Sequence, residues 1–131
     1  MVTTAEQICS QLSVFLAHKG HDYFSGQYSV IFRAGVWKPR TRPDTFQGVG
    51  AEGLSWLQEV KERFGVPVAT EVATPDHVRE ALFAGIDYLW IGARTSANPI
   101  AVQSIADTIR QTTRAPKGII IKNPVNSDAN L

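Results

Sequence analysis

The chain has 131 residues, of which 44% are hydrophobic and 19% are charged, a composition typical of one globular domain and not of a disordered chain. A formal net charge of +1 is too balanced to indicate a nucleic-acid partner or an anionic membrane surface. The single cysteine excludes a disulfide within the chain, and no apolar run approaches the roughly 18 residues of a membrane span. Because the N-terminus also lacks the basic and apolar regions of a signal peptide, we expect a cytoplasmic protein.

The first third of the chain predicts one helix and one strand. Thr3 and Thr4 precede Glu6 and Gln7 at the spacing of a capping box, and apolar residues then recur at helical spacing up to a stop at Gly20. Residues 28–32 form a short run of apolar and β-branched side chains, which predicts a strand ending at Arg33.

Helices and strands then alternate regularly. The remaining predicted elements are a helix from Leu54 to Phe64 closed by Gly65, a strand over 66–70, a helix beginning at Thr74-Pro75, a strand over 87–91, a helix beginning at Asn98-Pro99, and a strand over 118–121. The strands are almost continuously apolar, as in parallel sheets covered by helices on both faces. This order predicts an α/β fold in one domain, residues 1–131, but alone it does not distinguish an open doubly wound sheet from a barrel. The first strand is not followed by a glycine-rich phosphate motif, which disfavours a dinucleotide-binding fold.

Charged side chains mark the ends of all four predicted strands: Arg33, Glu71, Arg94 and Lys122. Because the carboxyl ends of parallel strands meet at one face, these groups are expected to converge there. Three cations would repel one another unless an anion lies between them, and Glu71 beside them suits holding a cation or orienting a water or a proton. The pattern therefore predicts a site for a small, multiply anionic metabolite. The alternative is that each strand simply ends in a polar residue that meets solvent.

The connection after the first strand is much longer than the usual 2–6 residues and is basic. Pro39 and Pro43 stiffen it, so Lys38, Arg40 and Arg42 are displayed from a constrained loop, which favours a functional role over a nucleic-acid patch.

The other reactive residue types give no sign of catalysis. His18, His21 and His77 lack the spacing of a zinc site, and we expect them at surface or interface positions. Cys9 lies among the apolar residues of the first predicted helix and is expected to be a packing residue.

Several ordered motifs carry a family resemblance over residues 29–126. They are Phe32-Arg33-Ala34-Gly35-Val36-Trp37-Lys38-Pro39-Arg40-Thr41, Phe46-Gln47-Gly48, Thr70-Glu71-Val72, Ile91-Gly92-Ala93-Arg94 and Lys122-Asn123-Pro124-Val125. Together they resemble 3-deoxy-D-arabino-heptulosonate 7-phosphate (DAHP) synthase of the class I family. Lys38-Pro39-Arg40-Thr41 argues against the sister enzyme, 3-deoxy-D-manno-octulosonate 8-phosphate synthase, whose loop has Ala and Asn after the lysine.

The resemblance implies a transferase that condenses phosphoenolpyruvate with erythrose 4-phosphate, the first step of the shikimate pathway to aromatic amino acids. It implies that Lys38 and Glu71 are catalytic, with Lys38 near the reacting carbons and Glu71 orienting the site. It also assigns phosphoenolpyruvate to Arg33, Lys38, Gly92, Ala93, Arg94 and Lys122, and erythrose 4-phosphate to Arg40 and Thr41.

The resemblance also predicts an incomplete (β/α)8 TIM barrel, with about four of the eight parallel strands and their flanking helices present. The family uses a divalent metal (Mn, Mg, Co or Zn), whose ligands belong to a first strand and to later strands that we do not find in this sequence. Half a barrel leaves two open sheet edges, so we expect self-association or poor folding. Two alternatives to an inactive enzyme fragment stay open: a non-catalytic half-barrel that binds a phosphorylated metabolite or a partner chain, and two copies that pair into an eight-stranded assembly.

Overall fold

The computed structural model describes residues 3–4, 6–7, 10, 30–40 and 46–123. Residues 3, 4, 6, 7 and 10 are helical, so a helix is present in this segment as predicted, but Thr3 and Thr4 lie within it and the capping-box prediction is wrong. Most of that predicted helix and its expected stop at Gly20 lie outside the described residues. Residues 28 and 29 of the first predicted strand also lie outside them.

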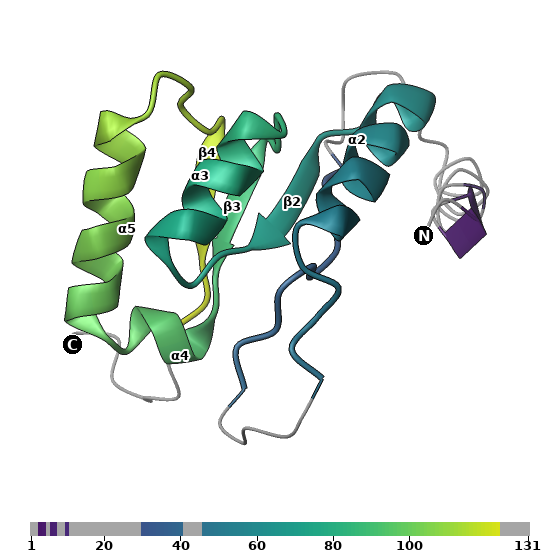
Figure 1. Cartoon of the computed structure of the whole chain (residues 1–131). Helices are drawn as coiled ribbons and strands as arrows, with labels where there is room; N and C mark the ends of the chain where they lie inside the picture. Colours follow the sequence, from purple (N-terminus) through teal and green to yellow (C-terminus); the bar gives the residue numbers. More distant parts are fainter. Residues whose placement is uncertain (1–2, 5, 8–9, 11–29, 41–45, 124–131) are drawn as a thin grey trace, which may run out of the picture.

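Four parallel strands form one sheet in the order β1-β2-β3-β4 (Figure 1). They are β1(Phe32–Arg33), β2(Val68–Glu71), β3(Tyr88–Ile91) and β4(Gly118–Ile121). Every strand lies beside the next one in the sequence, as in a barrel, whereas an open doubly wound sheet reverses its strand order. Within the described part of the chain the sheet does not close, and β1 and β4 are its edges. The prediction of an α/β fold with four parallel strands is confirmed.

Four helices connect the strands: α2(Glu52–Phe64), α3(Pro75–Phe83), α4(Ala93–Ser96) and α5(Pro99–Gln111). Helices α3 and α5 begin as predicted, each with an N-cap residue followed by a proline. The N-cap side chains of Thr74 and Asn98 accept hydrogen bonds from backbone amides of the first turn. Gly65 ends α2 in the left-handed conformation (φ 63°), which glycine adopts without a steric penalty. The four-residue helix α4 was not predicted, since it is too short to show an apolar period.

The core lies between the sheet and helices α2, α3 and α5, which line one side of it (Figure 1). Leu57, Val60, Val78 and Leu89 are fully buried there, in the positions that the helical and strand patterns predict. On the opposite face of the sheet, side chains such as Trp90 are only half-buried. The expectation that strands are buried on both faces therefore holds for β2 from Val68 to Thr70 but is wrong for β3, because a sheet that does not close leaves part of its concave side without opposing strands.

Asp87 ties the amino-terminal ends of the strands together. Its side chain is 3% exposed and accepts hydrogen bonds from Lys61 Nζ (3.0 Å), Lys117 Nζ (2.8 Å) and the backbone amide of Val68 (3.0 Å). Burial would raise the pKa of Asp87, but the hydrogen bonds from Lys117, Val68 and Lys61 outweigh it and hold that pKa below its usual range. Asp87 therefore stays ionised and joins α2, β2, β3 and the segment before β4 at the end of the sheet opposite the candidate site.

Candidate functional site

A cavity of about 390 Å³ lies at the carboxyl ends of the strands. We call it the strand-end cavity; it is lined by Arg33, Pro39, Glu71, Trp90, Gly92, Ala93, Arg94 and Lys122. All four charged residues that end the predicted strands are among these, so the structure brings them together at one opening. Three cations and one carboxylate around a half-open cavity favour a ligand with more than one negative charge.

The Arg33 guanidinium is held by two groups inside this cavity. It lies 4.2 Å from the ring centroid of Trp90, a cation–π contact, and its Nη2 is 3.6 Å from Glu71 Oε2. Glu71 and Trp90 are lateral partners on β2 and β3, so the sheet register itself fixes the spacing of these two groups. Neither contact uses the full set of guanidinium donors, and Arg33 keeps N–H groups available for an anion.

Gly92 makes room for the Glu71 carboxylate. A Cβ atom at this position would lie 2.2 Å from Glu71 Oε1, closer than any real Cβ contact, so only glycine allows the carboxylate to lie there. Gly92 thus leaves bare backbone beside the Glu71 carboxylate just before α4, and Arg94 in the first turn of that helix lines the same cavity.

Three hydrogen bonds fix the walls of the cavity. Arg94 Nη1 donates to the carbonyl of Pro39 (2.7 Å), which ties the loop after β1 to α4. Ser96 Oγ donates to the carbonyl of Lys122 (2.8 Å), and the Lys122 amide donates to Ile91 O (2.9 Å), which together fix the end of β4 beside β3. Ser96 was not singled out in the sequence, because nothing in its local pattern shows that α4 forms.

A second cavity of about 360 Å³ adjoins the first, and Pro39 lines both. We call it the loop cavity; it is lined by Trp37, Lys38, Pro39, Arg40, Gln47, Ala73, Thr74 and His77. The structure therefore divides the predicted site residues between two neighbouring cavities, with Lys38 and Arg40 in this one. Arg40 Nε donates to the carbonyl of Phe46 (3.2 Å), while Thr41 lies outside the described residues.

The loop cavity has a wall that the sequence did not reveal. The rings of Trp37 and His77 are stacked, with centroids 4.2 Å apart and planes 9° apart. His77 was expected at a surface or an interface, but its side chain is partly buried against Trp37, which is itself 9% exposed. The available signal was the Thr74-Pro75 cap, which makes His77 the third residue of α3 and places it near the strand end.

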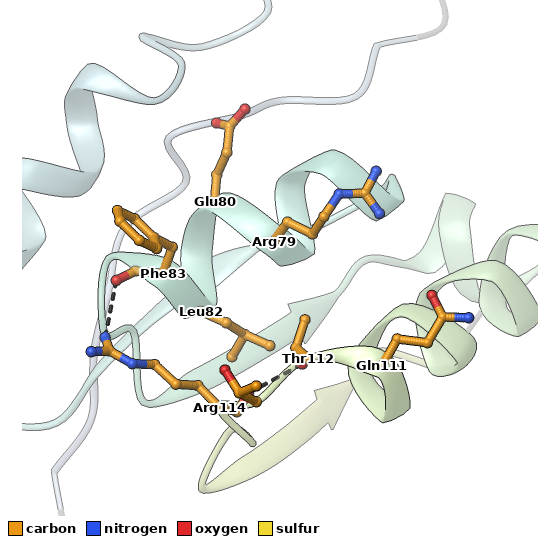
Figure 2. Close-up of a pocket in the computed structure, with 8 residues that line it drawn as sticks. Arg79, Glu80, Leu82, Phe83, Gln111, Thr112 and Arg114 are labelled. Atoms are coloured by element: carbon orange, nitrogen blue, oxygen red, sulfur yellow. Dashed lines mark hydrogen bonds between the residues drawn. The ribbon is translucent and has the colours of Figure 1, made fainter.

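A larger cavity, of about 640 Å³, lies away from the strand ends, between the carboxyl-terminal turns of α3 and α5 (Figure 2). Two of its polar lining groups are engaged within the protein: Arg114 Nη1 donates to the carbonyl of Phe83 (3.1 Å) and Thr112 Oγ1 to that of Arg114 (3.2 Å). It is also lined by Glu80 and by Arg79, which pairs with Asp76, whereas the strand-end cavity gathers three cations around one carboxylate. Size alone therefore does not identify the functional site.

Two further observations concern metals and membranes. Among the described residues, no three His, Cys, Asp or Glu side chains gather in a way that would hold a metal ion. The described side chains thus do not supply a site for the divalent metal that the resemblance implies. No helix in the same part of the chain is both long and apolar enough to span a bilayer.

The fold and the two cavities define a class of protein: a (β/α)-barrel segment that gathers three cations and one carboxylate at the carboxyl ends of its strands. The comparisons with known proteins agree, since the model of the DAHP synthetase I family matches residues 7–123. The chain belongs to this family, and the resemblance seen in the sequence is confirmed.

A curated sequence and a crystal structure from Thermotoga maritima are similar to this chain. A phospho-2-dehydro-3-deoxyheptonate aldolase is 41% identical over 69 residues, which are 52% of this chain and 20% of that protein. A crystal structure of phospho-2-dehydro-3-deoxyheptonate aldolase (DAHP synthase) matches 89% of this chain and 29% of the solved chain, with a TM-score of 0.58 and 26% identity. The chain therefore spans less than a third of the length of either relative.

Proposed function

We propose that the strand-end cavity binds phosphoenolpyruvate and that this chain carries the substrate-binding part of a DAHP synthase. The observation that carries the proposal is the convergence of Arg33, Arg94 and Lys122 on one cavity beside Glu71. Phosphoenolpyruvate has a phosphate and a carboxylate on a three-carbon frame, and two arginine forks with one lysine match two such anions. Membership of the DAHP synthetase I family supports this choice among small dianions.

The loop cavity is proposed to bind the phosphate of erythrose 4-phosphate through Arg40 and Thr41. Because this cavity shares Pro39 with the first one, the two substrates would meet near that residue. The Lys38 side chain bends back toward the end of β1, since its Cε lies 4.0 Å from where a Cβ on Gly35 would be. An ammonium group between the two substrates suits the stabilisation of negative charge that develops on the aldehyde oxygen.

The chemical balance of the reaction sets the remaining roles. A carbon–carbon bond forms between the methylene carbon of phosphoenolpyruvate and the aldehyde carbon of erythrose 4-phosphate. The product has one phosphate where the substrates have two, so one water is consumed and one inorganic phosphate is released. Glu71, held between Arg33 and the Gly92 backbone, is proposed to orient that water.

This chain alone is proposed to bind substrates without turning them over. It spans 20% and 29% of the two relatives, and its described residues do not form a metal site. A non-catalytic half-barrel is the second candidate, and it predicts the same binding without turnover even when the missing part of the barrel is supplied.

Self-association is proposed on separate grounds. Ile119 and Ile121 on the edge strand β4 are 45% and 61% exposed, and both edges of the described sheet are open. If β4 of each copy paired with β1 of the other copy, two copies would form eight parallel strands and both open edges would be covered.

The proposal is tested by titrating the full chain with phosphoenolpyruvate and following tryptophan fluorescence, since Trp90 lines the cavity and contacts Arg33. Saturable quenching is expected. Arg94→Ala should weaken binding by about tenfold to a hundredfold, the equivalent of one charge-assisted contact. Arg110→Ala on α5 is the matched control, because Arg110 is exposed and pairs only with Asp107 among the described residues. Equal affinity in the two variants would refute the assignment.

A further inference from the structure

The stacked pair of Trp37 and His77 joins the loop after β1 to helix α3. Trp37 immediately precedes Lys38, and its backbone pairs with Gly48 in an antiparallel bridge, while the Lys38 amide donates to Gln47 O (2.7 Å). The loop thus forms a two-stranded segment that carries Lys38 and Arg40. The flat contact of the two rings, with centroids 4.2 Å apart, fastens this segment to α3.

The hydrogen bonds around His77 determine its protonation state. The backbone amide of Ala73 donates to His77 Nδ1 (3.3 Å), so this nitrogen carries a lone pair and the ring is neutral. The His77 amide donates to Thr74 Oγ1 (3.2 Å), which fixes the residue in the first turn of α3. A proton on Nδ1 would set two N–H groups against each other and break the contact with Ala73.

We propose that His77 is a positioning residue whose neutral ring holds Trp37, and through it the Lys38-bearing segment, in the anion-binding arrangement. Protonation of His77 releases this arrangement and makes anion binding in the loop cavity sensitive to mild acid. This inference rests on the proposed function of the loop cavity as a phosphate site.

The charges that face His77 come from two described elements. Lys38 and Arg40, on the loop after β1, line the same cavity as His77. Asp76 and Glu80, on α3, favour it. Burial is the largest influence and lowers the pKa of His77, against the opposing effects of Glu80 and Asp76. The first turn of a helix also disfavours a cation, because the helix dipole is positive there.

The direction of the pH effect separates positioning from simple electrostatics. A proton on His77 adds a positive charge to a basic cavity, and Coulomb attraction alone would then strengthen anion binding as the pH falls. The positioning role predicts the opposite, because the released segment carries Lys38 and Arg40 away from the anion.

The test is a titration of the full, 15N-labelled chain with sulfate, whose charge stays constant between about pH 5 and 8, the range of histidine switching. The Trp37 indole N–H, assigned with Trp37→Phe, and the Lys38 amide report on the segment. We expect both signals to shift with the same midpoint as the His77 ring. Sulfate affinity should fall about fivefold toward acid, the change expected for the loss of one aromatic pair.

Three variants complete the experiment. His77→Phe keeps a flat ring on Trp37 without a titrating group, so its sulfate affinity should vary less than about twofold with pH. His77→Ala should bind weakly at every pH, and Glu80→Gln should move the midpoint of the Trp37 signal toward acid. If His77→Ala does not fold, the wild-type pH series and His77→Phe still decide the matter.

Sulfate affinity that rises as the pH falls would overturn the positioning role. Trp37 and Lys38 chemical shifts that do not change with the protonation of His77 would overturn it as well. The absence of sulfate binding at any pH would instead refute the proposed function of the loop cavity. In that case the Trp37 and Lys38 signals would still show whether His77 controls the segment.

Discussion

Replacing Asp87 with alanine should cost this chain a large part of its stability. The carboxylate is 3% exposed and joins four parts of the fold through Lys61, Lys117 and the Val68 amide. Lys61 and Lys117 are 38% and 61% exposed, so their ammonium groups regain water when the carboxylate is removed and contribute little to the loss. The Val68 amide is buried in the sheet and would be left without an acceptor, at a cost of about 1–3 kcal/mol.

Because the orphaned Val68 amide accounts for most of the loss, we expect Asp87→Ala to lower the free energy of unfolding by about 1–3 kcal/mol. Urea unfolding followed by far-UV circular dichroism measures this. Asp107→Ala is the matched control, because Asp107 is 48% exposed and pairs with Arg110 three residues away, which predicts a loss under about 0.5 kcal/mol. If Asp87→Ala were as stable as Asp107→Ala, Asp87 would not be holding the strand ends together and our account of the fold would be wrong.

Three further predictions follow from particular contacts. The pKa of Asp87 is below its ordinary 3.8 in the folded chain, so Asp87 takes up a proton in the unfolded chain at a higher pH than in the folded one. The wild type should therefore lose stability as the pH falls from just above 3.8. Asp87→Asn should lack this part of the acid transition in urea unfolding measured at a series of pH values. Gly92→Ala would place a methyl group 2.2 Å from Glu71 Oε1 and should weaken phosphoenolpyruvate binding in the fluorescence titration, with little change in the unfolding midpoint because the Glu71 side chain can turn away. Ile121→Glu should shift sedimentation toward the monomer, because Ile121 is 61% exposed on the edge strand; an unchanged distribution would exclude this face as the interface.

The sequence predicted the sheet and its long helices because their signals are local. The Thr74-Pro75 and Asn98-Pro99 caps, the glycine stops and the continuous apolar strands each depend on a few neighbouring residues. The parallel arrangement followed from the alternation of helices and strands. Helix α4 was missed because four residues contain no period, and its existence depends on packing at the end of β3.

The candidate site was predictable to the extent that topology determines it. Arg33, Glu71, Arg94 and Lys122 end successive strands, and parallel strands bring their carboxyl ends to one face. The stack of His77 on Trp37 links residues 40 positions apart on different elements, and no sequence pattern shows that two rings will meet. The division of Lys38 and Arg40 into a second cavity depends likewise on how the loop folds against α3.

The central claim is that the strand-end cavity binds phosphoenolpyruvate, and the most direct measurement is to map the backbone amide shifts of the 15N-labelled chain during a titration. We predict saturable shifts centred on Arg33, Gly92, Arg94 and Lys122, with the amides of the cavity between α3 and α5, such as Phe83 and Thr112, unchanged. Shifts centred on that other cavity, or none at saturating concentration, would contradict the account.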